Sequence, residues 1–239
     1  MTFRSTLDRL RARFPTAYWR GRNALALAQF YAFRLRAGTP GADAYDDAFW
    51  DFHSPGDWKG FARVILQHVP ARSIADIGCG QGLVLDGFAQ LDSTLQLKGY
   101  DESPAALRRA QSRNLSVVRL DFLALSAASA STLAADLTNV DLAVCLEVAE
   151  HLPAWHSHKL LTVISAPRAL VFSAAHPNQG GRYHVNEQPA EHWVAQLAAR
   201  GLRLAANDAD FRHAVAALDL PWWYRQNIHL FERRDPGSG

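Results

Sequence analysis

Residues 73–82 of this 239-residue chain read Ser-Ile-Ala-Asp-Ile-Gly-Cys-Gly-Gln-Gly. An apolar run typical of a strand leads into glycines at alternate positions, Gly78, Gly80 and Gly82, and residues 83–91 then have a helical pattern. Glycine is required where the backbone turns sharply from strand to helix and where a ligand contacts the main chain. The start of the helix adds unpaired N–H groups and the positive end of its dipole. The stretch therefore predicts a strand–loop–helix unit that binds a ligand at its glycine loop.

Strand and helix signals alternate through the rest of the chain. We expect strands at 73–78, 95–101, 116–121, 140–146, 168–174, 202–208 and 227–233. We expect helices at 55–68, 82–91, 103–113, 125–137, 156–165, 189–200 and 209–217. This alternation predicts an α/β fold of the doubly wound, Rossmann-like type, in which helices cover both faces of a mostly parallel sheet. Ligands of such sheets bind at the carboxyl ends of the strands, beside the first strand.

The segment before the sheet differs from the rest in charge. Residues 1–36 carry eight arginines and one acid, although the net charge of the whole chain is +2. A Gly-Thr-Pro-Gly cluster at 38–41 interrupts the helical pattern, so we expect a helical extension over 1–41 and a domain over 42–239. The basic extension is either a solvated helix packed beside the active site or a segment that associates weakly with an anionic membrane surface.

The cysteines and the apolar segments indicate the setting of the protein. Cys79 lies in the glycine loop and Cys145 lies in an expected buried strand, so we expect no disulfide between them. Reduced thiols are typical of a cytoplasmic enzyme. The apolar stretch 24–33 is too short to cross a membrane.

The end of the second expected strand offers carboxylates. Asp101 lies 19 residues after Gly82 and is followed by Glu102. A carboxylate at this place can accept hydrogen bonds from both hydroxyls of a ribose. The alternative is that Asp101 caps the next helix, a role that Ser103 could also fill.

The D-x-G-x-G-x-G pattern at 76–82 resembles the first motif of class I S-adenosylmethionine-dependent methyltransferases. The resemblance implies S-adenosylmethionine as cofactor, S-adenosylhomocysteine as product and a seven-stranded sheet with one antiparallel strand. It also implies that Asp76 orients the glycine loop and the methionine amino group, that Asp121 meets the adenine amino group and that Phe122 packs on the adenine ring. The cofactor residues expected in this way are Asp76, Gly78, Cys79, Gly80, Gly82, Asp101, Glu102, Asp121, Phe122 and Glu147, with Tyr45 and Trp58 either closing the site or belonging to the core.

The fourth expected strand opens into Glu-Val-Ala-Glu-His-Leu-Pro at 147–153. This form is similar to motifs of ubiquinone-pathway O-methyltransferases and to the metal site of small-RNA 3′-terminal 2′-O-methyltransferases. The second likeness implies that Mg²⁺ or Mn²⁺ is held by four side chains, which are Glu147, Glu150, His151 and His184, with His176 as a weaker choice. The alternative is that the two glutamates satisfy backbone donors and that His151 hydrogen-bonds locally.

Methyl transfer itself requires alignment of the acceptor and removal of one proton. His184 and His151 are the expected bases, and Glu187 is a weaker one. The Gly-rich loop at 177–193 and the aromatic stretch at 222–225 are expected near the acceptor, although the aromatic stretch can equally anchor the last strand. We expect methylation of an oxygen, less so a nitrogen, of a small molecule. A metal-dependent RNA ribose 2′-O-methyltransferase and a non-catalytic, cofactor-binding regulatory subunit are the alternatives.

Overall fold

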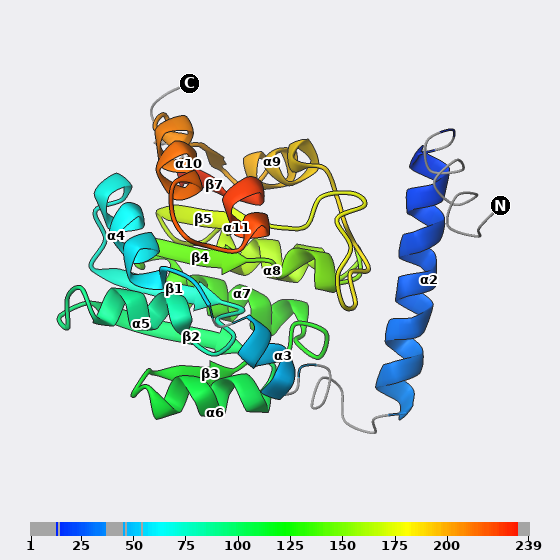
Figure 1. The fold of residues 1–239 in the computed structure, drawn as a ribbon, viewed down its shortest axis with the longest axis horizontal. Coiled ribbons are helices and arrows are strands. Elements are labelled where there is room, and N and C mark those ends of the chain that lie inside the picture. Colours follow the sequence, from blue (N-terminus) through cyan, green and yellow to red (C-terminus); the bar gives the residue numbers. More distant parts are fainter. Residues whose placement is uncertain (1–12, 14, 37–44, 46, 54, 234–239) are drawn as a thin grey trace.

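The computed structural model describes residues 13, 15–36, 45, 47–53 and 55–233 (Figure 1). The strands form one sheet in the order β3-β2-β1-β4-β5-β7-β6. The strands are β1 (Ser73–Ile77), β2 (Gln96–Asp101), β3 (Val117–Arg119), β4 (Leu142–Leu146), β5 (Ala169–Ser173), β6 (Leu202–Leu204) and β7 (His229–Arg233). The helices are α2 (Pro15–Arg36), α3 (Asp47–Phe52), α4 (Trp58–His68), α5 (Leu83–Ala89), α6 (Pro104–Ser112), α7 (Ala127–Leu137), α8 (Ser157–Ile164), α9 (Ala190–Ala198), α10 (Asp208–Ala216) and α11 (Trp222–Asn227), with a short 3-10 helix η1 (Ala149–His151).

The pairing of the strands confirms the predicted fold class. β1 pairs in parallel with β2 and β4, β2 with β3, and β4 with β5. β7 runs antiparallel to both of its neighbours, β5 and β6. Parallel neighbours need long crossover connections, and the helices between the strands supply them. The sheet is therefore the expected seven-stranded, mostly parallel sheet with one antiparallel strand.

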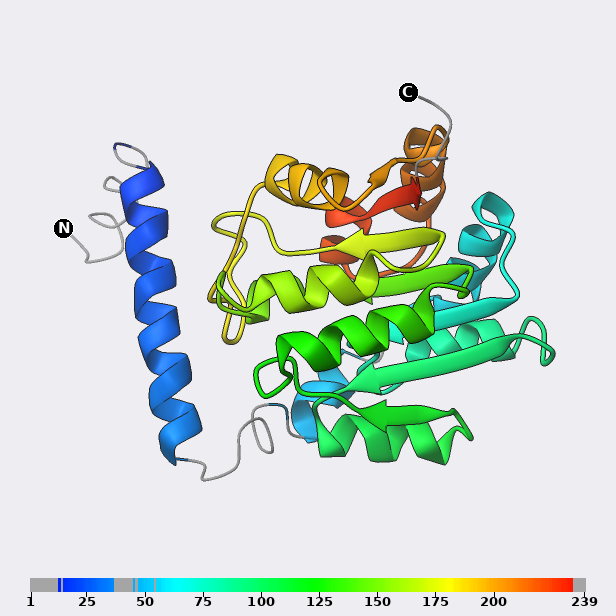
Figure 2. The ribbon, with the colours of Figure 1, turned by 180° about the vertical axis from the view of Figure 1, so that it is seen from behind.

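The central strand β4 packs against helices on both of its faces. Leu142 and Val144 belong to a buried cluster that includes residues of α4, α5 and α10. Ala143 and Cys145 belong to a second buried cluster, which includes residues of α7, α8 and α9. These two sets of helices lie on opposite sides of the sheet (Figures 1 and 2). Because both faces of β4 are buried, the polar segment that follows Leu146 starts from a fixed point.

Several elements differ from the expected ranges. β3 and β6 have three residues each, shorter than the expected 116–121 and 202–208. Both are edge strands, which have a pairing partner on one side alone. The stretch 222–227 is helix α11, where no element was expected, and the last strand begins at His229 rather than at 227. Pro221 precedes α11, and proline is favoured at helix starts.

Helix α2 lies along the edge of the sheet at which the strands end, beside the loop that follows β5 (Figures 1 and 2). The expected break at 38–41 and the domain boundary after residue 41 lie outside the described residues. Cys79 and Cys145 are both free and buried, as expected. Within the part of the chain that the structure describes, no helix combines the length and the apolar character that a membrane span needs.

Candidate active site

A cavity of about 550 Å³ lies at the carboxyl ends of β1, β2 and β4. Most of the expected site residues line it, which are Tyr45, Trp58, Asp76, Gly78, Cys79, Gly80, Asp101, Glu102, Phe122, Glu147, His151 and His184. Gly82, Asp121, Glu150 and Glu187 do not line it. The expected cofactor and acceptor residues thus share one space, as the topology of a doubly wound sheet predicts.

The glycine loop has the backbone that its glycines allow. Gly78, Gly80 and Gly82 have φ angles of 83°, 52° and 78°, all in the left-handed region. The N–H groups of Gly78 and Cys79 donate to Tyr100 O at 2.7 and 3.0 Å, which ties the loop to the end of β2. Gly82 is the N-cap of α5. The loop is therefore fixed from both sides before any ligand binds.

Asp101 connects the glycine loop to the end of β2. Its Oδ2 accepts from Gly80 N at 2.8 Å and its Oδ1 accepts from Ser103 N at 2.8 Å. The N-cap of α6 is Ser103, whose hydroxyl accepts from Ala106 N at 3.2 Å, so Asp101 does not fill that alternative role. A carboxylate has about four acceptor positions, so two remain for ribose hydroxyls. Glu102 lines the cavity beside it.

Asp121 and Phe122 have different positions. Oδ1 of Asp121 accepts from the N–H groups of Leu123 at 2.8 Å and Ala124 at 3.3 Å, and Asp121 does not line the cavity. The expectation that Asp121 meets an adenine amino group therefore receives no support from this geometry. Phe122 lines the cavity and is buried, as a residue that packs on a ring must be.

Asp76 lies in the cavity wall behind the glycine loop. It is 3% exposed, and burial, followed by the nearby Asp101 carboxylate, raises the pKa of Asp76 to about 8. The side chain is thus mostly protonated at neutral pH. A bound cation would favour its ionised form.

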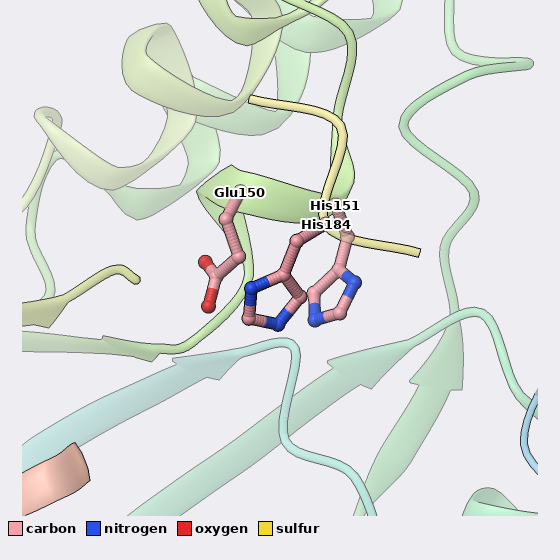
Figure 3. A group of neighbouring side chains, drawn as sticks. All are labelled: Glu150, His151 and His184. Carbon is pink, nitrogen blue, oxygen red and sulfur yellow. The ribbon is translucent and has the colours of Figure 1, made fainter. Parts of the chain in front are cut away.

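Three side chains form a compact group at one end of the cavity. Glu150, His151 and His184 each offer a ligand atom, and these atoms lie within 4.8 Å of one another. Figure 3 shows the Glu150 carboxylate and the two imidazole rings side by side, although the first two come from η1 and the third from the loop after β5. Glu150 is fully buried, and neither of its carboxylate oxygens has a hydrogen-bond partner among the described residues. An orphaned buried carboxylate beside two imidazoles fits a divalent cation.

Each imidazole has one nitrogen already engaged. His151 Nδ1 lies 3.0 Å from the hydroxyl of Tyr45, and His184 Nδ1 lies 3.2 Å from Oε1 of Glu187. A carboxylate can only accept, so Nδ1 of His184 carries the proton of that bond. Burial and the neighbouring His184 lower the pKa of His151 to about 3, which keeps that ring neutral. In the His184 ring Nε2 is the nitrogen that remains for a ligand or a proton, whereas the His151 ring also hydrogen-bonds to the backbone of Tyr183.

Glu147, expected as a fourth metal ligand, lies outside this group. Its carboxylate accepts from Asn227 Nδ2 at 3.2 Å and from Gln179 Nε2 at 3.2 Å. Its backbone is left-handed, with φ of 55°, a conformation that is uncommon for a residue with a side chain. Glu147 lines the cavity, and burial together with the nearby Glu147 carboxylate raises the pKa of Glu150, so the place of Glu147 as a fourth ligand stays a prediction.

Glu187, expected as a weak base, lies beneath the loop rather than in the cavity wall. It is fully buried, and its oxygens accept from the N–H groups of Asn178 and Gly180, both at 2.8 Å. It also pairs with Arg22 and with His184. Glu187 is thus placed to shape the loop that carries His184.

Several contacts around the cavity were missed by the sequence analysis. The Trp50 ring lies against Gly80, and Gln81 Nε2 donates to Trp50 O at 2.8 Å. Asn227 and Gln179 hold Glu147, and Arg22 reaches Glu187 from α2. No local pattern distinguishes these residues, because each acts on a partner that is distant in the sequence.

Comparisons with known proteins bear on the family and the fold of this chain. Residues 75–166 match the family described as "Methyltransferase domain". The ubiquinone biosynthesis O-methyltransferase of Burkholderia thailandensis is 34% identical over 87 residues, which are 36% of this chain and 36% of that protein. The chain thus matches about a third of the length of such curated relatives.

Solved structures resemble the whole fold. The S-adenosylmethionine-bound amino pentose methyltransferase CalS10 of Micromonospora echinaspora matches with a TM-score of 0.54 and 16% identity, over 74% of this chain and 92% of that one. The methyltransferase domain of bacterial CtHen1-C matches with a TM-score of 0.50 and 18% identity, over 74% of this chain and 100% of that one. Residues 75–166 thus match a methyltransferase domain, and the seven-stranded sheet is the fold of class I S-adenosylmethionine-dependent methyltransferases.

Proposed function

We propose that the protein transfers a methyl group from S-adenosylmethionine to an oxygen of a small-molecule acceptor, assisted by a divalent cation at Glu150, His151 and His184. The observation that carries the proposal is the shared cavity, in which the glycine loop and Asp101 face the same space as His151 and His184. A methyl donor bound at the first set would have an acceptor bound at the second within reach.

The donor half of the cavity, which consists of the glycine loop, Asp101 and Phe122, has only to bind the cofactor. Asp101 keeps two acceptor positions for the ribose, and Phe122 supplies an apolar wall for the adenine. Asp76 would lose its proton when the positively charged methionine end of the cofactor binds beside it, because a cation stabilises the carboxylate. Trp50, which lies against Gly80, would limit the access of water to this end of the cavity.

The metal half favours Mn²⁺ over Mg²⁺. One carboxylate and two imidazoles leave several coordination positions open, and imidazole suits later transition metals better than Mg²⁺, which prefers oxygen ligands. A cation there would lower the pKa of a bound acceptor hydroxyl. The Glu187 carboxylate fixes the tautomer of His184, as outer carboxylates commonly do for metal-binding histidines.

An oxygen acceptor is favoured over a nitrogen acceptor by this cluster. An amine needs little more than a base, whereas a hydroxyl has a high pKa and benefits from a charged partner. The likeness to a ubiquinone biosynthesis O-methyltransferase supports the same choice. The proposal includes a cytoplasmic location, in line with the two free cysteines.

The test uses purified protein, S-adenosylmethionine and a panel of catechols, sugars and amines, with the product S-adenosylhomocysteine as readout. We expect turnover of hydroxyl acceptors, at least a tenfold loss after EDTA treatment and recovery with Mn²⁺. Elemental analysis gives a second readout, with about one Mn²⁺ per wild-type chain. Full activity and no bound metal in the chelated protein would remove the metal from the proposal.

The variant His184→Ala separates catalysis from donor binding. We expect a fall in kcat of about 10²-fold or more, because the ring supplies either a ligand or a base. The affinity for S-adenosylhomocysteine, measured by calorimetry, should stay within about twofold. An equal loss of both would mean that His184 acts as a structural residue.

The RNA ribose methyltransferase remains the second candidate, because the sequence of residues 1–36 carries eight arginines and the cavity holds the cluster of Glu150, His151 and His184. A salt-sensitive affinity for a single-stranded RNA oligonucleotide and methylation of its 3′ ribose would support this candidate. Tight donor binding without transfer to either class of acceptor would support the regulatory subunit instead.

A further inference from the structure

Helix α2 forms part of the cavity wall on the acceptor side. Phe30 of α2 is 7% exposed, lines the cavity and meets Tyr183 edge to face with ring centroids 6.2 Å apart. One residue further on, Tyr31 stacks on Trp155. The helix therefore contacts both polar segments at this end of the sheet, the one after β4 and the one after β5.

Arg22 of the same helix reaches the buried Glu187. Its guanidinium forms an ion pair with the Glu187 carboxylate, whose side chain is fully buried. The positive charge of Arg22 therefore faces a carboxylate that water does not reach.

Glu187, which is held by Arg22, in turn holds the loop after β5 and the His184 ring. It accepts from the backbone N–H groups of Asn178 and Gly180, and it fixes the His184 ring through Nδ1. His184 in turn packs so closely on Gly181 that a Cβ at that position would overlap with Nε2 of the ring. Because the Glu187 carboxylate binds the start of the loop and also lies at its end, the His184 ring has little conformational freedom.

We infer that Arg22 is a positioning residue of the active site, which acts through Glu187 to hold the loop at 178–187 and the His184 ring in their working arrangement. Its importance for turnover rests on the proposed function of His184, whereas its effect on the ring does not. The N-terminal helix is thereby a working part of the acceptor site.

The energetics support a large effect from a distant residue. Removal of Arg22 leaves the buried Glu187 carboxylate without its compensating charge, which is unfavourable. Rearrangement of the loop, with exposure of Glu187 to water, avoids that cost, and His184 then loses its fixed partner. Loss of such an outer partner typically reduces metal affinity or activity by about 10–100-fold.

The test is a double-mutant cycle in the full chain. We expect Arg22→Ala and Glu187→Gln each to reduce kcat by about 10–100-fold, while the affinity for S-adenosylhomocysteine stays within about twofold. Both changes break the same chain of contacts, so their effects should not add. The kcat of the double variant should lie within about threefold of the kcat of the less active single variant. If the fold-loss in kcat of the double variant equals the product of the two single fold-losses, the inference is overturned.

Matched variants of α2 separate positioning from folding. Arg22→Lys keeps the charge and should recover at least a third of the activity that Arg22→Ala loses. Leu25→Ala, on the exposed side of the same helix, should leave kcat unchanged. If Arg22→Lys and Arg22→Ala lose equal activity while both are folded by circular dichroism, the inference fails.

A spectroscopic readout needs no acceptor. In ¹⁵N spectra of the histidine side chains, with the His184 signals assigned by comparison with His184→Ala, the wild-type ring should carry its proton on Nδ1. In Arg22→Ala we expect these signals to shift or broaden. If the wild type transfers no methyl group, the proposed function fails but this spectrum still tests Arg22. Unchanged His184 signals in Arg22→Ala would contradict the role inferred for Arg22.

Discussion

Gly80 shows how one residue of the loop serves both backbone and ligand. Its φ of 52° disfavours any side chain, and a Cβ there would lie 2.7 Å from the Trp50 ring. We expect Gly80→Ala to lose about 1–2 kcal/mol of stability and at least tenfold in affinity for S-adenosylhomocysteine. Gly201→Ala is the control, because Gly201 has a φ of 83°, a Cβ there would meet Arg233 only at an ordinary 3.7 Å, and Gly201 does not line the cavity. It should lose similar stability in urea unfolding and no affinity in calorimetry.

The carboxyl of Asp76 makes a prediction about pH. Its pKa of about 8 in the folded chain is above the unfolded value of about 3.9, so the stability tied to its proton is fully present below pH 4. That stability is lost as the pH rises toward 8, by about 1.4 kcal/mol per pH unit at most. Urea unfolding between pH 5 and 8 should thus show wild type losing stability relative to Asp76→Asn. If the free energies of unfolding of the two proteins change in parallel with pH, the raised pKa of Asp76 is contradicted.

At the scale of residues, the sequence predicted those contacts that are local. The glycine loop and Asp101 are fixed by strand, turn and helix within 30 residues, so their pattern is visible in the chain. The direction of Glu147 is set instead by Asn227, which is 80 residues away, and by Gln179. Side-chain partners of that kind leave no periodic signal in a single sequence.

Helix α3 covers the glycine loop, and two kinds of contact hold it. Arg109 of α6 forms ion pairs with Asp47 and Asp51 at 3.0 and 2.8 Å, but both carboxylates are more than two-thirds exposed. Exposed pairs of this kind contribute about 0–1 kcal/mol. Trp50 instead packs on Gly80, and its backbone carbonyl accepts from Gln81. The contact of Trp50 with the glycine loop should therefore contribute more to holding α3 in place than the ion pairs of Arg109.

This comparison gives a prediction for two variants of one element pair. Trp50→Ala should weaken S-adenosylhomocysteine binding by at least tenfold, because it opens the cavity above the glycine loop. Arg109→Ala should change it by less than about threefold, in view of the exposure of its partners. Titration calorimetry at equal ionic strength measures both. A larger effect from Arg109→Ala would mean that α3 is held mainly by charge.

Among the elements, the central strands and their helices were predictable and α11 was not. Strands β1, β4 and β5 are short apolar runs between turn signals, which is the pattern of buried parallel strands. The six residues of α11 carry tandem aromatic side chains without a helical period long enough to recognise. Their helical state depends on packing, such as the edge-to-face contact of Tyr224 with Trp58.

In the whole molecule, the two halves of the cavity have different origins. Most of the donor half comes from the stretch between β1 and Phe122, with Trp50 of α3 over the glycine loop. The acceptor half combines α2, η1, the loop after β5 and α11, which lie far apart in the sequence. This difference explains why the sequence pattern indicated the glycine loop and Asp101, whereas the ion pair of Arg22 with Glu187 required coordinates.

The ion pair between α2 and the loop after β5 also bears on how the protein comes into being. Arg22 leaves the ribosome early, whereas its partner Glu187 is synthesised only after β5 is complete. Contacts between such distant segments form late, because closing a long loop costs entropy. A newly made chain should therefore bind its methyl donor before it can catalyse methyl transfer. A refolding time course should show donor binding recovering earlier than catalytic activity.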